Sequence, residues 1–164
     1  MKLLLDTHAL FWALVEPDNL AADTRLALED PANQVFATLA SAQELAMKLS
    51  ANQWPEAKGL LQDFERLVVD EAGFFLLAPT AVDYLNMTRL PTVDGHKDPM
   101  DRLIIAMAIA RGLTLVSSDN NTPNYAVEWI TAGKGSGGGS PRQRDRIIPV
   151  EPLTPIPTVD PQIS

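Results

Sequence analysis

Short hydrophobic runs alternate with longer segments of helical period along the first 130 residues of the chain. In the longer segments the apolar residues recur at the spacing of an amphipathic helix. This alternation is typical of strand–helix units and predicts an α/β fold with a mainly parallel sheet. We expect strands at Lys2–Leu5, Gln34–Ala37, Phe74–Leu77, Thr114–Ser117 and Ala126–Ile130. We expect helices at Ala9–Val15, Ala21–Leu28, Leu39–Leu49, Glu56–Val69, Ala81–Met87 and Pro99–Arg111.

The composition changes near residue 131. The stretch GKGSGGGS, residues 133–140, is typical of a flexible tether. Six of the 13 prolines lie in the last 24 residues, so we expect extended or polyproline conformations there. We therefore divide the chain into a folded domain at 1–132, a linker at 133–140 and a tail at 141–164. Two interpretations of the tail stay open: a disordered end, or a partner-derived peptide that lies in a groove of the domain.

Length and composition limit the class of protein. With 164 residues and 46% hydrophobic content, the chain can bury one sizeable core. No run reaches the roughly 18 to 20 apolar residues of a membrane span. The first residues also lack the pattern of a secretory signal. We therefore expect a cytoplasmic protein with no membrane partner.

Charge and metal-binding residues limit the chemistry further. The chain has no cysteine and two histidines, so we expect any bound metal to have oxygen ligands. The formal net charge of −8 argues against binding nucleic acid by general attraction, because neutralising phosphates normally takes a basic face. A nucleic-acid function would need metal ions or a local basic patch.

Acidic residues follow the predicted strands. Asp6 comes directly after the first strand, and Asp119 follows the strand in LTLVSSD. In an open parallel sheet, ligands bind outside the carboxyl ends of the strands, so both acids lie at the rim of a potential site. Glu44 lies on the helix after the second strand, and Asp98 and Asp101 lie in KDPMDRLIIAMAIA.

Each acid also has a structural explanation. Asp98 before a proline makes a good helix start, and Asp101 then lies where the helix dipole favours an anion. Glu44 precedes Lys48 by four residues, the spacing of an ordinary helix pair. Asp6 can cap the first helix, and Asp119 can belong to a turn. For Asp98 alone the structural explanation is the better one.

Together the acids indicate a metal site. Four carboxylates at one rim would repel one another unless cations lay between them. Oxygen ligands suit Mg²⁺ or Mn²⁺, and magnesium completes its shell with water and substrate phosphate. A metal bound to Asp6, Glu44, Asp101 and Asp119 suits phosphodiester hydrolysis. It would also allow an acidic protein to approach RNA.

Four segments carry a resemblance to a known family. LLLDTHALFWAL, ASAQELAMKL, DPMDRLIIAMAIARGLTLVSSD and YAVEWI follow one another in this order. Over residues 1–130 they resemble the PIN-domain ribonucleases, specifically the VapC-like toxins of type II toxin–antitoxin systems. The resemblance implies a three-layer α/β/α sandwich and a Mg²⁺- or Mn²⁺-dependent endoribonuclease that cleaves single-stranded RNA. It also implies a cognate antitoxin that inhibits the toxin, and a homodimer.

The resemblance assigns roles by position. Asp6, Glu44, Asp101 and Asp119 correspond to the acidic quartet of the family, which is catalytic and binds the metal. Accessory positions are the acid Asp98 and the hydroxyls Thr7 and Ser117. The chain departs from the family at Gln43, where relatives commonly carry tryptophan, and in lacking an arginine before Asp119. Neither departure removes a metal ligand.

Basic residues near the rim are candidates for phosphate binding. They are Lys48, Lys97 and Arg102, although Arg102 can equally form an ion pair on the helix surface. His8 is expected to pack or hydrogen-bond beneath the site. In the tail, Arg142, Arg144 and Arg146 can pair with the site carboxylates as an inhibitory antitoxin-like segment would.

Three other classes stay open. A phosphatase of the aspartyl-phosphate kind needs a second aspartate two residues after Asp6, where His8 stands. A non-catalytic protein-binding module would need no metal. A PIN-fold DNA or structure-specific nuclease usually carries extra helical insertions, which this chain lacks.

Overall fold

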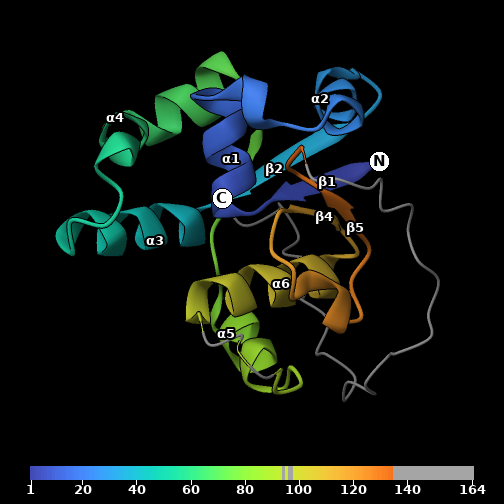
Figure 1. Ribbon diagram of the computed structural model, residues 1–164. Helices are drawn as coiled ribbons and strands as arrows, with labels where there is room; N and C mark the ends of the chain where they lie inside the picture. The colour runs from blue at the N-terminus through green and yellow to red at the C-terminus, as the bar shows by residue number, and fades with distance from the viewer. Residues whose placement is uncertain (94, 96–97, 135–164) are drawn as a thin grey trace, which may run out of the picture.

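Five parallel strands form one sheet with the order β3-β2-β1-β4-β5 (Figure 1). The structure is a computed structural model that describes residues 1–93, 95 and 98–134. The strands are β1 (Lys2–Leu5), β2 (Gln34–Thr38), β3 (Phe75–Leu77), β4 (Thr114–Ser117) and β5 (Trp129–Thr131). The longer helices are α1 (Thr7–Leu14), α2 (Ala22–Glu29), α3 (Leu39–Ser50), α4 (Lys58–Gln62), α5 (Ala81–Thr88) and α6 (Pro99–Arg111). Shorter helical turns are η1 (Pro17–Asn19), η2 (Pro55–Ala57), η3 (Arg66–Glu71) and η4 (Thr122–Asn124).

The strand order places a switch point beside the central strand. β1 pairs with β2 on one side, where Leu3 lies opposite Val35, and with β4 on the other, where Leu5 lies opposite Val116. The chain therefore leaves β1 in one direction and returns to its other side through α6. In open α/β sheets, the crevice outside the carboxyl ends of the strands at such a point is where ligands bind.

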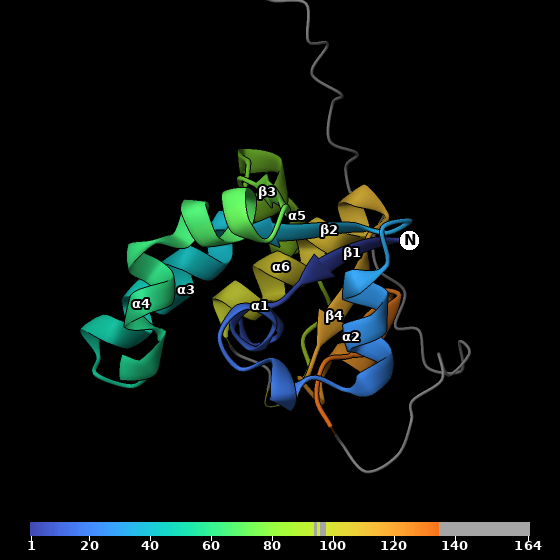
Figure 2. The same ribbon diagram turned by 90° about the horizontal axis from the view of Figure 1, so that it is seen from above.

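Helices cover both faces of the sheet and give three layers. Figure 1 shows α1, α2 and α4 on one side and α5 and α6 on the other. Side chains alternate along a strand, so Leu3 and Leu5 pack into the cluster with Leu10 of α1, whereas Leu4 packs into the cluster with Ile104 of α6. Figure 2, the view from above, shows that α3 and α4 lie against each other and extend past the edge of the sheet. The α/β/α sandwich with a parallel sheet is thus confirmed.

The helix ends follow local sequence signals. Asp98 caps α6 by accepting a hydrogen bond from the Met100 amide at 2.9 Å, and Pro99 occupies the first helical position. At the other end Gly112 has φ +60°, a left-handed conformation that favours glycine and ends the helix. These signals explain why the predicted bounds of α6 agree with the observed ones.

The predicted helix at Glu56–Val69 is wrong as one continuous element. The structure has η2, α4 and then the π-helical segment η3 in this region. The buried residues Leu60, Phe64 and Val68 are spaced by four, which places them on one face of the helical path. In η3 the Ala72 amide donates to the Leu67 carbonyl, five residues earlier, as in a π-helix. The last strand also begins at Trp129, three residues later than predicted.

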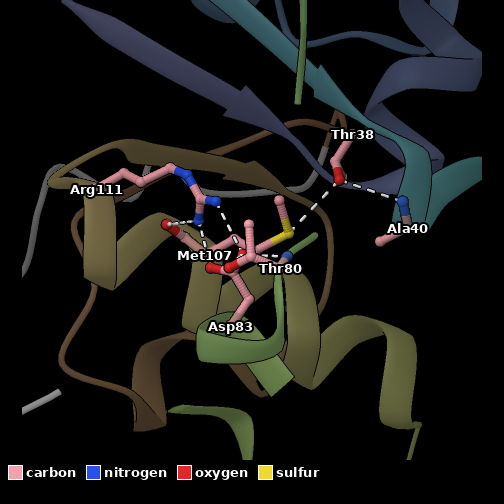
Figure 3. Close-up of polar contacts among 6 residues, drawn as sticks. All are labelled: Thr38, Ala40, Thr80, Asp83, Met107 and Arg111. Atoms are coloured by element: carbon pink, nitrogen blue, oxygen red, sulfur yellow. Dashed lines mark hydrogen bonds and ion pairs between the residues drawn. The ribbon is translucent and has the colours of Figure 1, made fainter. Parts of the chain in front are cut away.

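A buried ion pair joins α5 to α6 (Figure 3). Arg111 donates to both carboxylate oxygens of Asp83, at 2.5 and 2.9 Å. The amide and hydroxyl of Thr80 also donate to Asp83. The Asp83 side chain is fully buried, and both of its carboxylate oxygens accept hydrogen bonds. The pair fixes the C-terminal end of α6, whose other end carries the site acids.

Two further observations concern the limits of the fold. Contacts continue slightly past the predicted domain end, since Gly133 pairs with Leu20 and the Lys134 amide donates to the Asn19 carbonyl. Within residues 1–93, 95 and 98–134, every helix is too short or too polar to cross a bilayer. The predicted tail at 141–164 and most of the linker lie outside the described residues.

Candidate active site

Asp6 lies at the end of the central strand and at the start of α1. Its carboxylate accepts a hydrogen bond from the Ala9 amide at 2.7 Å, and its own amide donates to the Val116 carbonyl at 3.0 Å. Asp6 therefore caps the N-terminus of α1, as predicted from the sequence. It is also nearly buried at the carboxyl edge of the sheet, so capping and a place in the site are compatible.

The loop after β4 holds a second acid beside the first. The Ser117 hydroxyl accepts hydrogen bonds from the Asp119 amide at 3.0 Å and from the Thr122 hydroxyl at 3.1 Å. Ser117 also hydrogen-bonds to the Asp6 side chain. A hydroxyl has one proton and two lone pairs, so this arrangement uses its full capacity, with the proton directed to Asp6. Ser117 thus ties the two strand ends together.

Glu44 lies on the second turn of α3 and is almost completely buried. The hydroxyl of Thr7, at the start of α1, donates to one carboxylate oxygen. Lys48 donates to the other at 2.5 Å. The side chains of Glu44 and Lys48 are 4% and 25% exposed, so this is not the solvated pair that the helical spacing alone describes. Glu44 is held in place from both sides.

Asp101 lies on the first turn of α6, close to the cap Asp98. Together with Asp6 and Asp119 it lines a cavity of about 10 Å³, which has room for one water-sized occupant. The remaining wall of this cavity is formed by Ile104, Ile105, Leu115, Ser117 and Thr122. Three carboxylates from three separate elements therefore face one small space with an apolar floor.

The electrostatics of the cavity are unfavourable for negative charge. Burial, and then the charges of Glu44, Asp98, Asp6 and Asp119, raise the pKa of Asp101 from 3.8 to about 8. Burial also raises the pKa of Asp6, although hydrogen bonds from Ala9 and Ser117 offset part of this effect. At neutral pH, Asp101 consequently holds a proton unless a cation enters the cluster.

The residues fit a hard divalent cation. All donors around the cavity are oxygens, the ligand type of Mg²⁺ and Mn²⁺. In the described part of the chain, no group of three or more His, Cys, Asp or Glu side chains is placed so that it could hold a metal ion by itself. Magnesium usually takes one or two carboxylates and keeps several waters, so a complete protein cage is not required.

Not every predicted site residue lies at the rim. Arg102 donates to the carbonyls of Pro91, Leu90 and Met87 and to the Tyr125 hydroxyl, at 2.9 to 3.4 Å. Its guanidinium therefore holds the chain after α5, and neither the phosphate role nor the surface ion pair is supported. Lys97, Arg142, Arg144 and Arg146 lie outside the described residues.

Two features near the site were missed or misplaced by the sequence. Thr122 is fully buried and lines the cavity, and only the turn-forming TPN around it gave a local signal. His8 is exposed and stacks on Trp54, so the expectation that it lies beneath the site is wrong. The reason is that successive residues of α1 point in different directions, and Thr7 takes the inward position.

The comparison with protein families assigns the class of this fold and site. The model of the PIN domain family matches residues 3–128, which is most of the chain. The chain belongs to the PIN domain family. PIN domains are generally nucleases that use divalent metal ions. No curated protein matches the chain.

Solved structures show the same fold at low sequence identity. One is the crystal structure of VapBC2 from Rickettsia felis bound to a DNA fragment from their promoter, with a TM-score of 0.55 and 17% identity. The match covers 80% of this chain and 98% of that chain. Another is a domain of a functionally unknown protein from Methanocaldococcus jannaschii, with a TM-score of 0.50 and 16% identity. That match covers 85% of this chain and 96% of the other.

Proposed function

We propose that the protein is a VapC-like toxin, a metal-dependent endoribonuclease that hydrolyses single-stranded RNA in the cytoplasm. The observation that carries the proposal is the cavity lined by Asp6, Asp101 and Asp119, where clustered charge raises the pKa of Asp101 to about 8. Strongly perturbed acids in a cleft are typical of functional sites. Membership of a nuclease family gives this cluster a chemistry.

The acids around the cavity are the proposed cation ligands. Asp6, Asp101 and Asp119 face the space directly, and Glu44 adds its charge from α3. Bound there, Mg²⁺ or Mn²⁺ would supply Lewis-acid chemistry, lowering the pKa of a water and stabilising charge on the scissile phosphate. The residues of the chain do the positioning. Ser117 orients Asp6, and Thr7 and Lys48 orient Glu44.

Lys48 has a second proposed role. It is partly exposed beside the acidic cluster, where a phosphate of the substrate would need a positive partner. Lys97, which directly precedes Asp98 in the sequence, is proposed for the same role. A chain with net charge −8 needs such local compensation to hold RNA.

The test is cleavage of RNA by the full chain. We expect cleavage of total RNA in Mg²⁺ and in Mn²⁺, products with 5′-phosphate and 3′-hydroxyl ends, and no cleavage in EDTA. The Asp6→Asn variant controls for contaminating ribonuclease. If the full chain and the chain ending at Lys134 both leave RNA intact in both metals, the proposal is wrong. Preferential cleavage of matched DNA oligonucleotides would favour a DNA nuclease instead.

We also propose a protein partner that silences the enzyme. VapBC2, with which the chain shares its fold, is solved as a complex with DNA. By analogy, this chain has a cognate antitoxin, and the tail at 141–164 is an antitoxin-like segment whose Arg142, Arg144 and Arg146 pair with the site acids. Adding a synthetic peptide of residues 141–164 to the chain ending at Lys134 tests this. Absence of both binding and inhibition would end the proposal for the tail.

The proposed homodimer is tested separately. Light scattering of the full chain during gel filtration gives its mass directly. A mass near 17.9 kDa, that of one chain, would contradict the dimer without affecting the proposed chemistry.

A further inference from the structure

A second pocket opens beside the carboxylate cluster. It has a volume of about 260 Å³ and is lined by His8, Lys48, Gln53 and Trp54. His8 directly follows Thr7, which bonds to Glu44, and Lys48 itself bonds to Glu44. The pocket and the cluster therefore meet at these two contacts, with Glu44 between them.

The aromatic wall of the pocket is preorganised. The rings of His8 and Trp54 stack with centroids 4.6 Å apart and an interplanar angle of 22°. Phe11 of the core packs against Trp54 at 4.9 Å, so the indole is anchored from inside the domain. Rings held in this way lose little conformational entropy when a flat ligand stacks on them.

The other residues of the pocket are polar. The Lys48 ammonium lies 5.3 Å from the centre of the Trp54 ring and 2.5 Å from Glu44, so it faces both the pocket and the acidic cluster. Gln53 is exposed, three residues after the end of α3, and offers one amide, which can donate to and accept from a base edge. An aromatic pair, one amide and one cation match a nucleotide, since single-stranded bases are bound by stacking and by hydrogen bonds to their edges.

The pocket is small and open to solvent, which suits a single base of a longer strand. Pockets for drug-sized molecules measure about 300–1,000 Å³, and this one lies below that range. An apolar peptide anchor is a poor match, because it would bury the polar Gln53 amide without giving it a hydrogen-bond partner.

We propose that His8, Lys48, Gln53 and Trp54 form a nucleotide subsite, in which one unstacked base of the RNA strand lies against the His8–Trp54 pair and Lys48 contacts the adjoining phosphate. The inference rests on the proposed function and deepens it. Because Lys48 lies between the two sites, a base held here sets which phosphate of the strand lies at the carboxylates. The subsite would thus contribute to the choice of the cleaved bond.

Binding of a fluorescein-labelled single-stranded RNA decamer tests the subsite. The full chain carries Asp6→Asn and is held in Mg²⁺, so that the strand stays intact, and fluorescence anisotropy gives Kd. We expect Trp54→Leu and His8→Ala to raise Kd by about 5- to 100-fold, the range for losing one stacked base. Trp54→Phe should restore binding. Trp129→Phe, on the far strand of the sheet, is the matched control and should leave Kd unchanged.

A change in the ligand separates stacking from a folding defect. Decamers with a single abasic nucleotide are compared at each position, and one position should weaken binding to the Asp6→Asn chain. That penalty should disappear when Trp54→Leu is added, since the two changes remove the same contact. If Trp54→Leu does not fold, exposed His8→Ala gives the same comparison.

The outcomes distinguish the subsite from the proposed function. Equal Kd values for the Asp6→Asn chain with and without His8→Ala or Trp54→Leu would overturn the subsite, while RNA cleavage by the unmodified chain would leave the proposed function intact. If the Asp6→Asn chain binds no RNA and the unmodified chain cleaves none, both are overturned.

Discussion

Asp83 and Asp101 lie on the two helices that cover one face of the sheet, yet their pKa values move in opposite directions. Burial alone would raise the pKa of Asp83, but hydrogen bonds from Arg111 and Thr80 outweigh it and lower the pKa. Burial and the charges of nearby carboxylates raise the pKa of Asp101 to about 8. The counter-charge of Asp83 is Arg111, which lies within the fold (Figure 3), whereas the charges that shift the pKa of Asp101 are those of other acids.

The difference separates a structural acid, Asp83, from Asp101, for which we propose a function. A buried carboxylate with an internal arginine stabilises the arrangement of α5 and α6 and leaves no charge to bind anything else. A cluster of acids destabilises the empty fold, and a cation from outside relieves that cost. The burial of an acid therefore does not reveal its role until the charges of the neighbouring side chains are known.

Arg111→Met should have the largest effect on stability. The change leaves the fully buried Asp83 without its partner, and breaking a buried pair in this way costs about 3–5 kcal/mol. Urea unfolding of the full chain measures it. Arg25→Met removes the exposed pair with Glu29 and should cost under about 1 kcal/mol. Similar losses in both variants would show that the buried pair is not special.

Asp101→Asn should separate activity from stability. We expect RNA cleavage to fall by more than about 100-fold, since loss of even an outer partner of a metal ligand costs 10- to 100-fold. In EDTA at pH 8 the same variant should melt at a higher temperature than the parent, because it removes one charge from the cluster. Asp18→Asn, at a solvated position, is the matched control. A variant that cleaves normally would remove Asp101 from the site.

Mn²⁺ or Mg²⁺ should stabilise the protein through the acidic cluster alone. A ligand present at 100 times its Kd raises the free energy of unfolding by about 2.7 kcal/mol. The increase should be lost in Asp6→Asn and kept in Arg111→Met, because neither Asp83 nor Arg111 lines the cavity. Thermal unfolding with and without metal measures both. An unchanged increase in Asp6→Asn would place the cation elsewhere.

The two acids should give opposite pH slopes in EDTA. Between pH 3.8 and about 8 folded Asp101 binds a proton that the unfolded chain has lost, so its contribution to stability falls as pH rises. Asp83, with a lowered pKa, contributes stability above its ordinary value of 3.8 that is lost as pH falls further. One proton changes stability by at most about 1.4 kcal/mol per pH unit. The free energy of unfolding of Asp101→Asn, measured from pH 3.8 to about 8, should fall less steeply with pH than that of the parent. An equal slope in both proteins would contradict the raised pKa of Asp101.

Much of the fold was predictable because its signals are local. The apolar runs placed β1 and β4, and the Asp–Pro pair at Asp98 placed the start of α6. Asp6 and Asp119 were predicted near each other because the carboxyl ends of parallel strands meet at one edge. The structure puts both at the cavity.

The failures concern features that local patterns do not specify. The spacing of Leu60, Phe64 and Val68 indicated a helix, but it did not indicate that the last part of the segment is π-helical. The carbonyl partners of Arg102 come from the chain after α5, and no local pattern indicates them. A charged side chain can reach many partners, so sequence spacing does not fix which one it meets.

The sequence by itself determined which residue types could do chemistry here: hard oxygen donors at strand ends and no thiolates. Periodicity and capping depend on neighbours within a few residues, so they are readable along the chain. The tertiary structure decided which acids share a space, which has an internal counter-ion and where His8 meets Trp54. Those outcomes depend on burial and on distances across elements, which exist only once the three layers have packed.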